Sequence, residues 1–220
     1  MRTLFLKAAR GFPWWTIPIS AVSVVALTAG LTPLLLKAIG IDALPEQRIR
    51  PIGGWSNTFI SLVIVAPIVE ELLCRALLLN GLRNKWNFTI GTIGSSSAFC
   101  LMHVFGGFIL WPSQFTFGVL ASFAYRKSRT LLIPIMIHSI ANFFNFLILF
   151  TYSGKQLSVD LALIVLCFSS PILLLCIYLW ARNPKGNNSL GAHMIHWVSA
   201  VTSLNISPPL VDVHFSSREC

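Results

Sequence analysis

The segment APIVEELLCRALLLNGLR, from Ala66 to Arg83, places three ionisable side chains inside an apolar stretch. At the centre of a membrane helix, Glu70, Glu71 and Arg75 would each cost about 2.5 to 3.5 kcal/mol of insertion free energy. The thirteen Leu, Ile, Val and Phe residues of the surrounding span return only about 0.3 to 0.6 kcal/mol each. We therefore expect the three charges to be paired, or to face a polar space between helices.

Helical spacing separates these charges into two groups. Glu71 and Arg75 lie four residues apart and about 40° apart around a helix, so they can form an intrahelical ion pair. Glu70 lies about 140° from Arg75 and requires a partner from another helix. Pro67, one turn earlier, removes a backbone hydrogen bond close to the carboxylates.

Two later apolar segments offer partners for Glu70. The first, FCLMHVF, contains His103, and the second, IHSIANFFNF, places His138, Asn142 and Asn145 on one helical stripe. Counting about 1.5 Å per residue from the cytosolic end of each predicted span puts Glu70, His138 and Asn142 near mid-depth and His103 farther out. Such residues serve either catalysis and transport or simple hydrogen bonding between helices, and both interpretations are open on this evidence.

The elements that position these side chains are predicted to be membrane-spanning helices. Hydrophobic residues make up 55% of the chain and charged residues 10%, and its mean hydropathy is +0.75, unlike a soluble domain. The apolar runs have the length of a helix that crosses a bilayer. We predict an all-α, polytopic transmembrane bundle with six spans: Trp14 to Ile39, Ser56 to Asn80, Phe88 to Leu110, Ser113 to Tyr125, Thr130 to Tyr152 and Ser158 to Ala181.

The positive charge of the chain is predicted to orient it in the membrane. With both termini in the cytosol, eleven Lys and Arg residues fall in inner segments and four in outer loops, as the positive-inside rule requires. The net charge of +9 is thus an orientation signal, and it does not indicate nucleic-acid binding. We expect a multi-pass protein of a bacterial cytoplasmic membrane.

The composition changes after the last span. We predict a transmembrane domain over residues 1–183, with its motifs in residues 56–146, and a polar tail over residues 184–220. The tail contains His193 and His196, but two histidines without a third ligand are more often incidental than a metal site.

Three motifs on successive predicted helices resemble those of the CAAX-protease and bacteriocin-processing family of intramembrane proteases, which includes the type II CAAX prenyl endopeptidases. The motifs are Glu70-Glu71-x-x-x-Arg75, Phe99-x-x-x-His103 and His138-x-x-x-Asn142. The resemblance covers roughly residues 56–146. Cys74 departs from it, because relatives commonly carry an aromatic or other apolar residue before the arginine.

The resemblance implies a catalytic role for four residues. Glu70 would activate a water molecule for attack on a peptide carbonyl, and His103 would help to bind or orient that water. His138 and Asn142 would stabilise the oxyanion. Glu71, held by its arginine, would support the helix and tune the catalytic carboxylate electrostatically.

The cofactor requirement follows from the same residues. Glu70, His103 and His138 are a plausible zinc-binding set with an open position for water. That arrangement would make Glu70 a ligand and leave Glu71, already engaged with Arg75, as the base. We therefore favour a glutamate mechanism without a cofactor, while zinc stays an alternative.

The expected partners are the lipid bilayer and a membrane-embedded or lipidated peptide or protein substrate. Two other interpretations of the polar cluster stay open. One is a non-enzymatic transporter, immunity factor or scaffold protein that uses the cluster for binding. The other is a degenerate relative with a closed substrate path.

Overall fold

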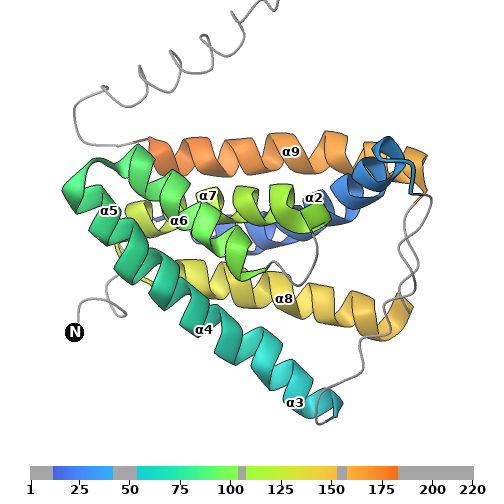
Figure 1. Ribbon diagram of the computed structural model, residues 1–220, viewed down its shortest axis with the longest axis horizontal. Helices are drawn as coiled ribbons and strands as arrows, with labels where there is room; N and C mark the ends of the chain where they lie inside the picture. Colours follow the sequence, from blue (N-terminus) through green and yellow to red (C-terminus); the bar gives the residue numbers. More distant parts are fainter. Residues whose placement is uncertain (1–11, 42–53, 104–107, 153–157, 183–220) are drawn as a thin grey trace, which may run out of the picture. The chain divides into compact units, whose positions relative to one another are not determined.

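The computed structural model describes residues 12–41, 54–103, 108–152 and 158–182, which form six helices (Figure 1). They are α2 (Thr16–Ala38), one continuous helix made of α3 (Trp55–Phe59), η1 (Ile60–Val65), α4 (Ala66–Glu71), η2 (Leu72–Leu79) and α5 (Asn80–Lys85), then α6 (Phe88–Met102), α7 (Trp111–Ser128), α8 (Leu132–Tyr152) and α9 (Val159–Ala181). A short 3₁₀ turn, η4 (Phe108–Leu110), precedes α7. The predicted all-α class is confirmed.

The chain divides into two units, residues 1–181 and 182–220, and the helices belong to the first. The predicted polar tail, with His193 and His196, lies outside the described residues. Within the first unit, α2 and α9 are long and apolar enough to cross a membrane, while α6 and residues 132–148 of α8 are apolar but shorter. Large apolar side chains of α9 point outward, including Phe168 at 71% exposure. An exposed apolar surface of this kind marks contact with a membrane or with another protein.

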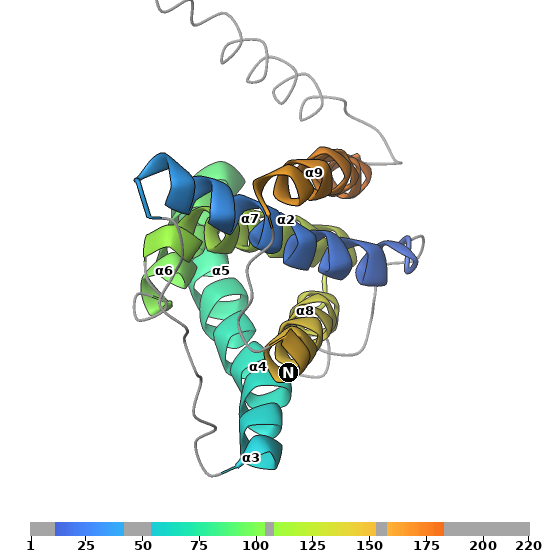
Figure 2. The same cartoon turned by 90° about the vertical axis from the view of Figure 1, so that its right-hand side faces the viewer.

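Helices α2 and α9 pack side by side (Figure 1, Figure 2). Near one end of the pair, Trp180 Nε1 donates a hydrogen bond of 3.0 Å to Thr16 Oγ1. Farther along, a Cβ on Gly30 would lie 2.8 Å from Leu166 Cγ and 2.9 Å from the Ala162 carbonyl oxygen. A residue without a side chain is needed at Gly30 because the two helices approach so closely there.

The helix that carries the glutamates is longer than the predicted span. It continues past Asn80 to Lys85, and only two residues separate it from the first residue of α6, Phe88. Glu70 lies 15 residues before Lys85, and His103 lies 15 residues after Phe88. Antiparallel helices joined by so short a turn place residues equally far from it at similar heights. The predicted offset of His103 was therefore wrong, because the depth count began at the wrong residue.

Helix α6 packs closely against both its neighbours. A Cβ on Gly91 would lie 3.0 Å from the Leu79 carbonyl oxygen, and one on Gly118 of α7 would lie 2.8 Å from Ser96 Cα. The helix ends at Met102, before the predicted end of the span at Leu110. These close contacts hold α6, which leads to His103, against the helix that bears Glu70 on one side and against α7 on the other.

Candidate active site

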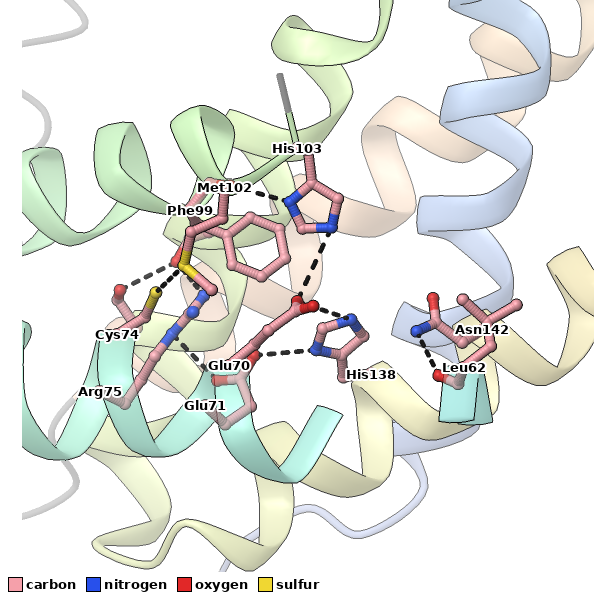
Figure 3. Close-up of polar contacts among 12 residues, drawn as sticks. Leu62, Glu70, Glu71, Cys74, Arg75, Phe99, Met102, His103, His138 and Asn142 are labelled. Carbon is pink, nitrogen blue, oxygen red and sulfur yellow. Dashed lines mark hydrogen bonds and ion pairs between the residues drawn. The ribbon is translucent and has the colours of Figure 1, made fainter. Parts of the chain in front are cut away.

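A buried ion pair between Glu71 and Arg75 supports the site (Figure 3). Glu71 Oε2 lies 3.1 Å from Arg75 Nε, and both side chains have 0% exposure. The contact is an ion pair and not a well-aligned hydrogen bond. Arg75 Nη2 also donates a hydrogen bond of 3.1 Å to the Gly118 carbonyl oxygen, and its guanidinium lies 5.2 Å from the centre of the Phe99 ring. The predicted intrahelical pair is present, and it ties α4 and η2 to α6 and α7.

His138 of α8 connects the two glutamates. Its Nδ1 lies 3.1 Å from Glu71 Oε1, and its Nε2 lies 3.7 Å from Glu70 Oε2. The Phe117 ring, 4.7 Å away between centroids, packs against the buried imidazole. Because a carboxylate accepts hydrogen bonds, Glu71 fixes Nδ1 as a donor and leaves Nε2 facing Glu70.

His103 lies on the opposite side of Glu70. Its Nδ1 is 2.8 Å from the Phe99 carbonyl oxygen, which only accepts hydrogen bonds, so Nδ1 carries a proton. Nε2 lies 3.7 Å from Glu70 Oε2. The side chain of His103 is 28% exposed and that of Glu70 is 17% exposed. The side chains of Glu71 and Arg75 are instead fully buried. His103 and Glu70 therefore form the open part of the site.

The two imidazoles and the carboxylate of Glu70 converge on one oxygen atom. Glu70 Oε2 has an imidazole Nε2 at 3.7 Å on each of two sides and no hydrogen-bond partner among the described residues. This oxygen is itself buried, although the Glu70 side chain as a whole is 17% exposed. A carboxylate flanked by two imidazoles is an arrangement that suits general base catalysis.

Asn142 is engaged by the backbone of the glutamate-bearing helix. Its Nδ2 donates a hydrogen bond of 2.9 Å to the Leu62 carbonyl oxygen. In this π-helical stretch, the Ala66 N–H bonds the Ser61 carbonyl oxygen, five residues back. Continuing that register would assign the Leu62 oxygen to residue 67, which is a proline and has no N–H. Asn142 therefore supplies the hydrogen bond that Pro67 cannot.

Two residues of α7 belong to the site and were missed as functional in the sequence. Phe117 packs against His138 and lies 5.9 Å from the Arg75 guanidinium, while Gly118 supplies the carbonyl acceptor for Arg75. No motif spacing identifies either residue, because both reach the site through the packing of α7 on α6.

A zinc ion would require at least three ligand side chains close together. Within the parts of the chain that the structure describes, no group of three or more His, Cys, Asp or Glu side chains has the geometry of a metal site. The zinc alternative, with Glu70, His103 and His138 as ligands, stays a prediction from the sequence.

Comparison with known proteins finds a family model that matches the part of the chain that carries the site. Residues 53–144 match the family model described as Type II CAAX prenyl endopeptidase Rce1-like, and this range contains all three motifs. An Escherichia coli protein described as "Uncharacterized 24.3 kDa protein" is 26% identical over 137 residues, which are 58% of this chain and 59% of that protein. The match therefore spans less than two thirds of that relative. No solved structure is significantly similar to the chain.

Proposed function

Since residues 53–144 form a type II CAAX prenyl endopeptidase Rce1-like domain, we propose that the chain is an intramembrane endopeptidase. Its substrate is a membrane-embedded or lipidated peptide or protein. The observation that carries the proposal is the convergence of His103 Nε2 and His138 Nε2 on Glu70 Oε2, each at 3.7 Å. A carboxylate and two imidazoles in a shielded site suit general acid–base hydrolysis.

The proposed reaction begins at Glu70. Its carboxylate takes a proton from a water molecule, and the water oxygen forms a bond with the carbonyl carbon of the substrate peptide. His103 Nε2 accepts a hydrogen bond from the same water and orients it. The protonated Glu70 then gives its proton to the leaving nitrogen as the carbon–nitrogen bond breaks, which restores the carboxylate. No serine or cysteine nucleophile takes part.

We propose that His138 and Asn142 stabilise the oxyanion. In its imidazolium form, His138 donates from Nδ1 to Glu71 and from Nε2 toward the developing charge, while Glu71 balances the imidazolium. Asn142 has two amide hydrogens, one of which is donated to the Leu62 carbonyl oxygen, so the other is the candidate oxyanion donor. Arg75 holds Glu71 in place and acts as a positioning residue.

The membrane arrangement is proposed on the same basis. Six helices and the excess of basic residues in the predicted inner segments support six spans with both termini in the cytosol. A bacterial cytoplasmic membrane is the proposed location. The motif domain covers residues 56–146 within a transmembrane unit of residues 1–183.

The test replaces Glu70 with Gln, which keeps the size of the side chain and removes the base. Membrane peptides are compared by mass spectrometry between cells that carry the wild type and cells that carry Glu70→Gln. Asp160→Asn is the matched control, because it removes a carboxylate from the first turn of α9, outside the cluster. We expect an uncut peptide to accumulate only with Glu70→Gln.

The accumulated peptide is then added to the purified proteins to measure cleavage directly. We expect the Asp160→Asn variant to cleave it like the wild type and the Glu70→Gln variant to be inactive. Cleavage by Glu70→Gln at the wild-type rate would eliminate the glutamate mechanism and favour a binding or packing role for the cluster.

A further inference from the structure

A second polar cluster lies at the turn of the α5–α6 hairpin, far along the same helices from the glutamates. Its charged members are Arg83 of α5 and Arg126 of α7. The Arg126 guanidinium lies 4.3 Å from the centre of the Phe88 ring. The pKa of Arg126 is lowered from its ordinary value, first by burial of the guanidinium and second by the positive charge of Arg83. Two neighbouring cations of this kind are unfavourable unless a negative charge lies between or beside them.

The positions of the two arginines are fixed by packing around them. Asn80 Nδ2 donates a hydrogen bond of 2.9 Å to the Tyr125 hydroxyl. Asn80 lies about one turn before Arg83 on the same helix, and Tyr125 directly precedes Arg126. A Cβ on Gly91 of α6 would lie 3.2 Å from the Arg83 backbone nitrogen, so α5 and α6 are in close contact here. These contacts hold together the segments of α5, α6 and α7 next to the two arginines.

The described residues contain no acidic partner for this pair. Their carboxylates are Glu70 and Glu71, in the active-site cluster, and Asp160, in the first turn of α9. Neither Arg83 nor Arg126 forms an ion pair with any of these. Arg126 Nη1 is buried and has no hydrogen-bond partner within the described ranges. A buried guanidinium nitrogen requires an acceptor, and no described residue supplies one to Arg126 Nη1.

We propose that Arg83 and Arg126 bind the phosphate group of an anionic phospholipid. Guanidinium groups bind phosphate oxygens with paired hydrogen bonds, and basic sites between membrane helices bind anionic lipid headgroups. The surroundings favour a lipid over a free anion. Trp86, in the turn beside the pair, is 53% exposed, and its ring lies under Lys85 at 4.7 Å, as in residues that anchor a helix at the membrane interface.

The apolar residues next to the turn fit the rest of a lipid molecule. Ile90 and Ile93 follow on α6, three residues apart and therefore on one face, and both are exposed. A headgroup at the arginine pair would place acyl chains along such exposed apolar side chains. Free phosphate would gain nothing from them.

The experiment measures thermal unfolding of the purified full chain in a non-ionic detergent. Dioctanoyl phosphatidylglycerol, dioctanoyl phosphatidylcholine and inorganic phosphate are added separately. We expect phosphatidylglycerol alone to raise the unfolding temperature of the wild type. Arg83→Gln and Arg126→Gln should each weaken the apparent affinity roughly tenfold, because each removes charged hydrogen bonds to the phosphate.

The matched control is Arg129→Gln, which removes an exposed basic residue just past the end of α7 and should keep the full response. An equal response to phosphatidylcholine would overturn the phosphate site, and an equal response to inorganic phosphate would overturn the lipid assignment. A wild-type response in both Arg83→Gln and Arg126→Gln would also overturn the proposal. Arg83 is exposed, so its variant tests the site even if Arg126→Gln does not fold.

Discussion

Replacing Asn142 with alanine removes the donor of the 2.9 Å hydrogen bond to the Leu62 carbonyl oxygen. The proline five residues after Leu62 has no N–H with which to replace it in the π-helical register. A carbonyl left without a donor inside an apolar environment loses the full hydrogen bond, and this costs about 1 to 3 kcal/mol. We expect Asn142→Ala to lower the free energy of unfolding by that amount.

The cost should shrink when the backbone donor is restored. Pro67→Ala adds an N–H to the helix, so the carbonyl oxygens of this turn no longer lack a donor. In the Pro67→Ala background, Asn142→Ala should therefore cost less than in the wild type. The coupling free energy between the two substitutions is expected to be about 1 to 2 kcal/mol, in the range for residues that share one hydrogen-bonding group.

The four proteins of this cycle are unfolded with SDS in mixed micelles, and their free energies of unfolding are compared. Asn145→Ala provides the control, since it makes the same chemical change three residues along α8. We expect its coupling with Pro67→Ala to stay below about 0.5 kcal/mol. Additive effects of Asn142→Ala and Pro67→Ala would refute the account of the Leu62 carbonyl.

The same variants separate the two roles of Asn142 in a cleavage assay. If its second amide hydrogen stabilises the oxyanion, Asn142→Ala stays slow in the Pro67→Ala background even where stability is recovered. If the residue only supplies Leu62, activity returns together with stability. The first result is the one that the proposed mechanism predicts.

Three further outcomes follow from the structure. Arg75→Ala leaves the buried Glu71 carboxylate without its cation and should lower the free energy of unfolding by about 3 to 5 kcal/mol. The SDS titration measures this loss, and adding Glu71→Gln to Arg75→Ala should recover part of the lost stability. Gly118→Ala would place a methyl group 2.8 Å from Ser96 Cα and should destabilise the protein by about 1 to 3 kcal/mol, whereas Gly81→Ala, with open space around it, should not; equal stability of the two would contradict the packing argument. A zinc chelator should leave cleavage of the accumulated peptide unchanged, and a loss of activity restored by zinc would contradict the glutamate mechanism.

The part of the site that lies within one helix was predictable from the sequence. The four-residue spacing of Glu71 and Arg75 is sufficient to predict their ion pair, because both residues belong to the same turn. The motif order also identified His103 and His138 as partners for Glu70. These inferences use only local helical geometry and residue chemistry.

The contacts between helices were less predictable. The depth of His103 was wrong because the apolar run ends near Asn80, while the helix itself continues to Lys85 through polar residues that do not break it. The partner of Asn142 depends on a π-helical register that hydropathy does not reveal. Pro67 indicated that a carbonyl would lack its donor, but only packing of α8 against η1 determines which side chain supplies one.

The α5–α6 hairpin makes the site sensitive to the length of its two arms. Glu70 and His103 meet because 15 residues separate each from its end of the turn. One residue inserted in either arm would shift the two side chains by about 1.5 Å and rotate one of them by about 100°. A matching insertion in the other arm would bring Glu70 and His103 back to the same height, but it would not restore the directions in which their side chains point. Extra residues beside Trp86 would disturb neither, so lengthening is tolerated only at the turn.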